Sequence, residues 1–303
     1  MRHYTVALAA AFLALSAYAE DPVSPKAPEF TTKTSGISVG AGFGTGTYGE
    51  QIPGHVALEL DGVKSWDGRK YVLTWNAQAG ATGGYAGNQH PGFFFAGGYL
   101  KGNGELGYRL TPESNWSPYM SGGADAAFSG VAALGTPLDK YDTINNLDGL
   151  AGVNGAFSLR YSLGASYLNP KHALTLTAFV QEALRAPGSF SDSTLYNEVG
   201  LHGQYDYKNS FSIVMEALYG TSLLDTHDSA FGSTTEKERF EAVMSVRKLF
   251  GKGWWVALDT KVSEEGAKTV YSGSPVTYTT NGPLSPYVGL SLGIPIELGV
   301  PAK

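Results

Sequence analysis

Residues 195–219, LYNEVGLHGQYDYKNSFSIVMEALY, decide the fold of this chain. Mostly apolar and mostly polar residues alternate up to Tyr207, and the alternation restarts at Phe211 after Lys208-Asn209. Successive side chains of a strand point to opposite faces, so this pattern predicts two amphipathic strands joined by a tight turn. Each predicted strand is long enough for a tilted bilayer crossing, which needs roughly 9–11 residues.

The same alternating unit recurs along most of the chain. We predict twelve strands, over residues 37–43, 56–60, 71–79, 94–110, 120–128, 153–163, 174–180, 195–207, 211–219, 240–246, 254–262 and 288–294. Connections after the even strands are mostly tight, whereas those after the odd strands are usually longer. This asymmetry is typical of bacterial outer-membrane barrels, with both chain ends on the short-turn side. The sequence therefore predicts an all-β fold, a transmembrane antiparallel up-and-down β-barrel of about 12 strands.

Aromatic residues support a membrane barrel, because amphipathic rings favour the membrane–water boundary. They gather beside the predicted short turns: Trp66, Tyr108, Trp116, Tyr119, Tyr167, Tyr205, Tyr207, Phe211, Phe250 and Trp254. The alternative is a soluble β-sandwich or lipocalin-like barrel, in which aromatic residues scatter and the core faces hold Leu and Val. After the first 19 residues, no apolar run is long enough for a membrane-spanning helix.

The start of the chain predicts export. Arg2 and His3 precede an apolar run over residues 6–15, and Ser16-Ala17-Tyr18-Ala19 follows it. This order predicts a secretory signal peptide over residues 1–19, cleaved after Ala19. We expect the proline-containing residues 20–34 to form a flexible periplasmic lead and residues 35–303 to form the barrel.

The composition excludes several classes of protein. The chain has no cysteine, which rules out disulfides and metal–thiolate sites. Its formal net charge is −6, and loss of the leader removes one arginine and no acid. An acidic chain without a basic run is a poor nucleic-acid binder, so no nucleic-acid partner is expected.

Residues 104–123, GELGYRLTPESNWSPYMSGG, resemble the strand–turn–strand unit of small Gram-negative outer-membrane β-barrels. The resemblance extends over residues 36–298 and concerns an architecture, with no particular family indicated. It implies an outer-membrane location. Such barrels often end their last strand on an aromatic residue that helps assembly, whereas this chain ends in LGVPAK. Because proline cannot donate to a strand ladder, we expect the last strand to finish near Pro295.

The predicted inner face carries charges of both signs, which we take as candidate pore-lining groups. They are Lys101, Glu105, Arg109, Asp125, Arg160, Glu198, His202, Asp206, Glu216, Arg239, Glu241, Arg247, Asp259 and Lys261. Opposed charges can line and constrict a water-filled pore and set its ion preference. They can equally form a paired network that plugs the lumen, because buried charges need partners. Inward-facing Val214, Leu218 and Trp255 argue against a wide pore.

Two motifs carry the residue types of a catalytic site. His202 lies between Glu198 and Asp206 on one strand face, where carboxylates could orient a catalytic base. No nucleophile is matched to it, so a hydrogen-bonding role in the lumen is the simpler interpretation. His227-Asp228-Ser229 has the residue types of a triad, but adjacent loop residues seldom converge in space. The His-Ser-Asn run of twelve-stranded lipid hydrolases is not found, and no catalytic residue is predicted.

A glycine motif and the absence of thiols bear on cofactors. Gly44, Gly46 and Gly49 spell G-x-G-x-x-G, but no βαβ unit surrounds them, so they predict a strand end and the first loop. We predict no cofactor and no metal site.

The leading functional hypothesis is a narrow, porin-like passive channel whose partners are outer-membrane lipid and small polar solutes or ions. Acidic residues in the predicted loops favour a mild preference for cations: Asp139, Asp142, Asp148, Asp225, Asp228, Glu264 and Glu265. The first alternative is a non-conducting structural or surface-interaction barrel that displays residues 129–149 and 264–283. A lipid-modifying enzyme is the second alternative.

Overall fold

A computed structural model describes most of the chain. The described residues are 33–46, 49–66, 69–87, 93–134, 151–186, 193–207, 210–223, 226–228, 233–271, 277–281 and 284–296. The predicted signal peptide and nearly all of the predicted lead lie outside these ranges. No helix within them is long and apolar enough to cross a membrane.

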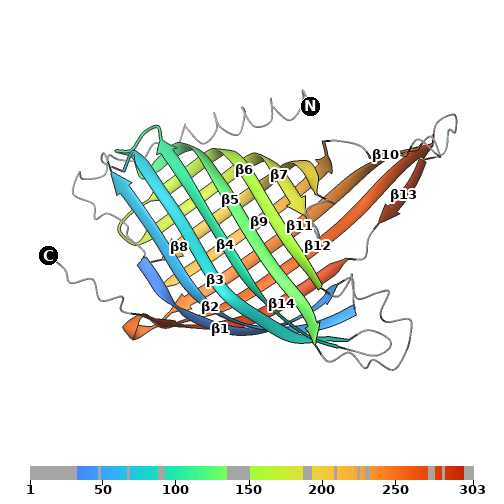
Figure 1. Cartoon of the computed structure of the whole chain (residues 1–303). Helices are drawn as coiled ribbons and strands as arrows, with labels where there is room; N and C mark the ends of the chain where they lie inside the picture. The colour runs from blue at the N-terminus through green and yellow to red at the C-terminus, as the bar shows by residue number, and fades with distance from the viewer. Residues whose placement is uncertain are drawn as a thin grey trace.

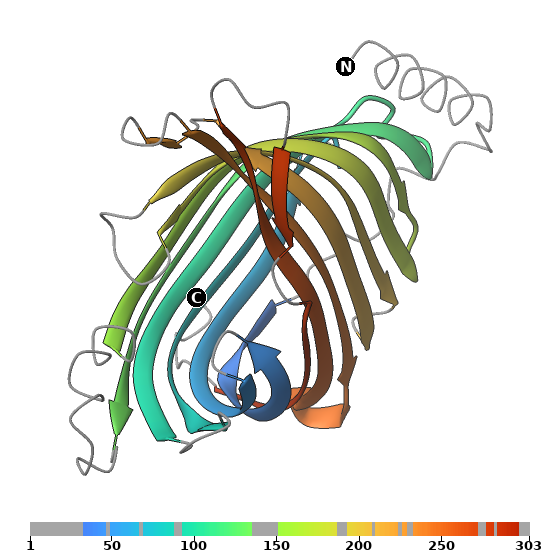
Figure 2. The same ribbon diagram turned by 90° about the vertical axis from the view of Figure 1, so that its right-hand side faces the viewer.

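Within the described residues, fourteen strands form one antiparallel sheet, and all except β10 and β13 close into a barrel of twelve. The barrel strands are β1 (Lys33–Gly46), β2 (Gly49–Trp66), β3 (Tyr71–Gly87), β4 (Phe93–Arg109), β5 (Trp116–Leu134), β6 (Ala151–Leu168), β7 (His172–Ala186), β8 (Thr194–Tyr207), β9 (Phe211–Ser222), β11 (Ser233–Leu249), β12 (Trp255–Tyr271) and β14 (Ser285–Pro295). Each pairs with its neighbour in chain order, and the tilted strands wrap round one central space (Figures 1 and 2).

The first and last strands close the barrel. Ile37 of β1 lies opposite Ile294 of β14, and Val39 lies opposite Leu292. Closure pairs the backbone groups that an open sheet would leave at its two edges, which hydrocarbon does not tolerate. The predicted twelve-stranded antiparallel barrel is confirmed.

The two faces of the wall differ in polarity in the way that a membrane barrel requires. Large apolar side chains point outward, with Leu201 66% exposed and Leu290 59% exposed. The buried side chains on the inner face are largely polar: Ser38, Glu59, Gln78, Ser158, Ser162, Thr177, Gln181, Glu198, Arg239 and Ser291. A soluble protein has the reverse arrangement, so the exposed apolar band is a lipid-facing surface.

We call the end of the barrel that carries the short connections the turn end. Aromatic rings pack in pairs there, including Tyr71 with Tyr108 and Trp116 with Tyr167. In the β11–β12 connection the ring of Phe250 stacks on Trp254 at a centroid distance of 4.0 Å. These pairs belong to the aromatic belt that the sequence predicts beside the short turns, whereas Tyr119, predicted with them, is buried and donates to Glu105 inside the barrel.

The opposite, loop end carries more strand than predicted. β10 (Thr226–Asp228) and the start of β11 lie within the predicted loop 221–236, whereas β12 and β13 (Thr277–Asn281) cover much of the predicted loop 264–283. Figure 1 shows β10 and β13 beside the projecting start of β11 and end of β12. The sequence pattern does not reveal these strands, because both faces of a strand beyond the bilayer meet water and the apolar–polar alternation is lost. The backbone hydrogen bonds between the strands nevertheless continue.

The last strand ends as predicted at Pro295, which lies opposite Gly36. The β11–β12 connection contains a 3₁₀ turn, Gly251–Gly253, in which Gly253 has φ of 81°. Only glycine adopts this left-handed conformation without strain, so Gly253 suits the tight return of the chain toward β12.

Candidate functional site: the barrel interior

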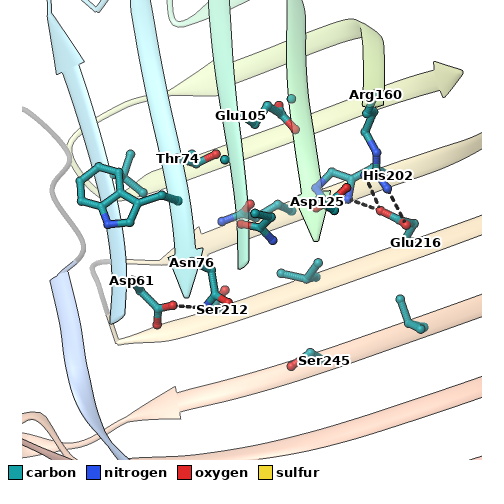
Figure 3. A pocket seen from close by; sticks show the side chains of 18 of the residues that line it. Asp61, Thr74, Asn76, Glu105, Asp125, Arg160, His202, Ser212, Glu216 and Ser245 are labelled. Atoms are coloured by element: carbon teal, nitrogen blue, oxygen red, sulfur yellow. Dashed lines mark hydrogen bonds and ion pairs between the residues drawn. The ribbon is translucent and has the colours of Figure 1, made fainter. Parts of the chain in front are cut away.

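The middle of the interior is crossed by an ion pair between distant strands. Arg160 of β6 donates to both carboxylate oxygens of Glu216 on β9, at 2.7 and 2.9 Å. The Nδ1 atom of His202 on β8 lies 3.1 Å from the same carboxylate (Figure 3). β7 and β8 separate β6 from β9 in the sheet, so the arginine side chain spans a chord of the lumen.

A second cluster surrounds Glu198 on β8, whose side chain has no exposed surface. Its carboxylate accepts hydrogen bonds from Arg239 at 2.8 Å, from Arg185 at 3.2 Å and from Gln181. Gln181 also accepts a hydrogen bond from Nε of Arg160 at 2.9 Å. The amide of Gln181 therefore joins this cluster to the central ion pair.

The same network continues to the far side of β11. Arg239 forms an ion pair with Glu241. The Nζ atom of Lys261 on β12 lies 2.9 Å from the same Glu241 carboxylate. Charges of opposite sign thus alternate from β6 round to β12. This arrangement satisfies the rule that charges removed from bulk water carry partners.

A third cluster lies nearer the turn end. Arg247 of β11 contacts Asp61 at 3.0 Å and Glu59 at 3.3 Å, both on β2. Glu59 also accepts hydrogen bonds from Ser38 and Gln78. Three strands, β12, β14 and β1, separate the two partners in the sheet, so this contact also crosses the lumen.

Between these clusters lies a cavity of about 540 Å³. Its acidic lining residues are Asp61, Glu105, Asp125, Asp206, Glu216 and Glu241, and its guanidinium groups belong to Arg160, Arg185 and Arg247. The acids outnumber the guanidinium groups by three. Carboxylates therefore predominate in the lining of the cavity, although one of them, Glu241, is also paired with Lys261 and Arg239.

Three of the cavity acids accept hydrogen bonds from neutral groups. Glu105 accepts from the hydroxyl of Tyr119 at 3.1 Å, and Asp125 accepts from Ser158 at 3.1 Å. Asp206 accepts from Gln204 at 2.9 Å. These three carboxylates therefore differ from Glu198 and Glu216, which accept hydrogen bonds directly from arginines.

The remaining predicted pore-lining residues lie elsewhere on the inner wall. Lys101 lines a neighbouring cavity of about 220 Å³, and Asp259 accepts a hydrogen bond from Ser245 at 2.6 Å. Arg109 lies at the turn end, where it donates to the carbonyls of Ser114 at 2.9 Å and Asn115 at 3.0 Å. Arg109 therefore anchors the β4–β5 turn and lies apart from the central network.

The predicted grouping of His202 with Glu198 and Asp206 does not match the contacts in the structure. His202 pairs with Glu216, which lies directly opposite it on β9, while Glu198 is taken up by arginines. Cross-strand neighbours approach more closely than residues four apart on one strand, and this explains the difference. His227 and Asp228 belong to β10, and Ser229 lies outside the described residues.

Sequence reasoning omitted three groups that complete the interior, namely Asp61, Gln181 and Arg185. Asp61 and Gln181 lie one residue beyond the predicted strands 56–60 and 174–180, and Arg185 lies five residues beyond, because β2 and β7 continue to Trp66 and Ala186. Within the described ranges, no three His, Asp or Glu side chains gather so that they could hold a metal ion.

No protein-family model and no curated protein matches the chain. Solved structures with a similar architecture include the β domain of the Bordetella autotransporter BrkA, at 13% identity and a TM-score of 0.38, covering 85% of this chain and 98% of that one. The translocator domain of the autotransporter NalP from Neisseria meningitidis has 12% identity and a TM-score of 0.36, with 96% and 94% covered. The P. putida toluene transporter TodX has 8% identity and a TM-score of 0.35, with 90% and 91% covered. Identities this low are informative about architecture alone.

Proposed function

We propose that the protein is a narrow passive channel of the bacterial outer membrane that favours small cations. The observation that carries the proposal is the interior cavity, where acidic groups outnumber guanidinium groups by three. Acidic side chains lining a pore attract cations and repel anions, and the low-dielectric wall strengthens their field. The predicted loop acids would add to the same preference at the loop end.

The crossing ion pairs support a narrow channel over a wide one. Arg160 and Arg247 both reach acids on distant strands, so two side chains divide the lumen. The inward apolar side chains of Leu218 and Trp255 are also buried and take up further space. A solute that passes must therefore be small and polar.

Reversal potentials in a planar bilayer under a KCl gradient test the ion preference. The substitution Asp125→Asn removes one charge from the cavity wall and should shift the reversal potential toward that of a non-selective pore. Glu182→Gln is the matched control, because Glu182 is exposed beside inward-facing Gln181 and points away from the lumen. Equal permeation of K⁺ and Cl⁻ in the wild type would refute the cation preference.

The crossing ion pairs also favour a second candidate, a non-conducting barrel that displays its loops. In that case the folded protein carries no current, and its loops bind a surface partner. An unboiled sample that migrates faster on a denaturing gel would show that the barrel is folded, so that a silent bilayer could be interpreted. Catalysis has weaker support, because His202 is paired with Glu216 and Arg160 holds the same carboxylate.

Export by a cleaved signal peptide belongs to the same proposal. Amino-terminal sequencing of protein extracted from the outer membrane should give a chain beginning at Glu20. A mature chain that retains residues 1–19, or one recovered from the soluble periplasm, would contradict it.

A further inference from the structure

Two arginines of the interior rest on aromatic rings in the same way. The guanidinium carbon of Arg247 lies 4.0 Å from the ring centroid of Trp255. That of Arg160 lies 4.0 Å from the ring centroid of Phe179. Both rings are inward-facing and 3% exposed. Stacking of a guanidinium on an aromatic face is attractive, and it also restricts where the arginine can lie.

Each of these rings lies directly opposite a glycine on the neighbouring strand. Trp255 pairs with Gly293 of β14, and Phe179 pairs with Gly200 of β8. A Cβ atom built on Gly293 would fall inside the indole ring, and one built on Gly200 would meet both the Phe179 ring and the carbonyl of Ala217. The ring can lie flat against the wall only where its partner has no side chain.

The far end of each arginine is also fixed. Arg160 forms a bidentate ion pair with Glu216, and Arg247 forms ion pairs with Asp61 and Glu59. Each guanidinium is thus held between a ring beneath it and carboxylates across the lumen. Both arginines line the same cavity, so their positions help to determine how much of that space stays open.

We propose that the two glycine–aromatic–arginine stacks, Gly200–Phe179–Arg160 and Gly293–Trp255–Arg247, determine the size limit of the lumen. The proposal rests on the channel function and names the class of solute that passes, namely small cations, because the two fixed guanidinium groups occupy part of the cavity. A side chain at either glycine lifts the ring from the wall and moves the guanidinium into the lumen. The passage then becomes both narrower and more positive at that level.

Gly293→Ala tests the proposal, because the nearest atoms to its added methyl group all belong to the Trp255 ring. We expect roughly a twofold loss of K⁺ conductance and a larger loss for tetramethylammonium, because a constriction discriminates by size. Gly130→Ala is the control for an added methyl group that displaces no ring, since a Cβ there meets nothing within 4 Å. In a Trp255→Leu background, Gly293→Ala should change neither conductance further, because the ring that it displaces is gone.

A second measurement separates this proposal from the channel function. The chain has no cysteine, so Ser245→Cys introduces a single thiol into the cavity. The rate at which a small cationic thiol reagent modifies it should fall in Gly293→Ala and stay unchanged in Gly130→Ala. If the wild type carries no current while the labelling rates differ in this way, the proposed channel function is refuted and the proposed role of the stacks is supported. If Gly293→Ala folds and matches the wild type in both conductance and labelling rate, the stack proposal is overturned.

Discussion

Removal of the negative charge from Glu198, with its shape retained, should destabilise the barrel markedly. The side chain of Glu198 is 0% exposed, and Arg239 and Arg185 both donate to it together with Gln181. Both carboxylate oxygens of Glu198 accept hydrogen bonds, so in Glu198→Gln an amide NH₂ group, which can only donate, faces a donor of a neighbouring side chain. Hydrogen bonds to charged groups contribute about 1.5–3 kcal/mol, against roughly 1 kcal/mol for neutral ones, and a buried donor left unpaired costs about 1–3 kcal/mol.

These values give a loss of about 2–4 kcal/mol in the free energy of unfolding. The lower half of that range allows for Arg185, whose side chain is 26% exposed and can recover hydration. Urea titration of the protein in lipid vesicles, read as the fraction that keeps its faster mobility in unboiled samples, measures the change. The control Glu182→Gln lies on the exposed outer side and should stay within about 0.5 kcal/mol of the wild type.

A second pair of variants tests whether the effect comes from the arginines. If Glu198 acts through Arg239, the double variant Glu198→Gln/Arg239→Gln should cost less than the sum of the single changes, because both lose the same contact. A change of less than about 0.5 kcal/mol in the free energy of unfolding of Glu198→Gln would contradict this role of Glu198. Strict additivity of the two substitutions would show that the pair is not coupled.

Three further predictions concern other parts of the barrel. Arg109→Met should lower the free energy of unfolding by about 1–3 kcal/mol, measured by the same titration, because turn carbonyls lose a charged donor. Arg160→Gln should raise single-channel K⁺ conductance on the order of twofold and strengthen the cation preference, since Glu216 loses its main partner; an unchanged conductance would contradict the placement of the constriction. Leu201→Arg, on the lipid-facing side, should cost about 2–4 kcal/mol of unfolding free energy in vesicles, whereas Leu201→Ile should have little effect.

The barrel could be predicted from the sequence because one physical rule governs nearly all of it. Lipid outside and polar groups inside force a period of two along each strand, as Leu201 and His202 illustrate. The rule weakens where water meets both faces, so β10, β13 and the outer part of β12 were expected to be loop. The positions of the short turns could also be predicted from the sequence, because residues such as Pro112 and Gly253 do not readily continue the backbone pairing of a strand.

The partners within the interior could not be predicted in the same way. Alternation places a residue on a face, but the register of the strands decides which residues meet. His202 meets Glu216 because the β8–β9 connection pairs Tyr207 with Phe211, and a shift by one residue would have brought a different side chain opposite. Contacts such as Arg247 with Asp61 depend on barrel closure and are 186 positions apart in the chain.

The carboxylates of the interior therefore divide into two sets with different consequences. Glu198 and Glu59 are almost fully buried, and each accepts hydrogen bonds from an arginine together with a glutamine. Their charges are compensated, so they stabilise the wall and contribute little field to the cavity. Glu105 and Asp125 line the cavity and accept hydrogen bonds from hydroxyl groups, with no direct ion pair among the described residues, so under the proposed function they are the carboxylates expected to act on a passing ion. Neutralising the first set should cost stability, whereas neutralising the second should change ion preference while the barrel stays folded, and this separation distinguishes a channel from a plugged scaffold.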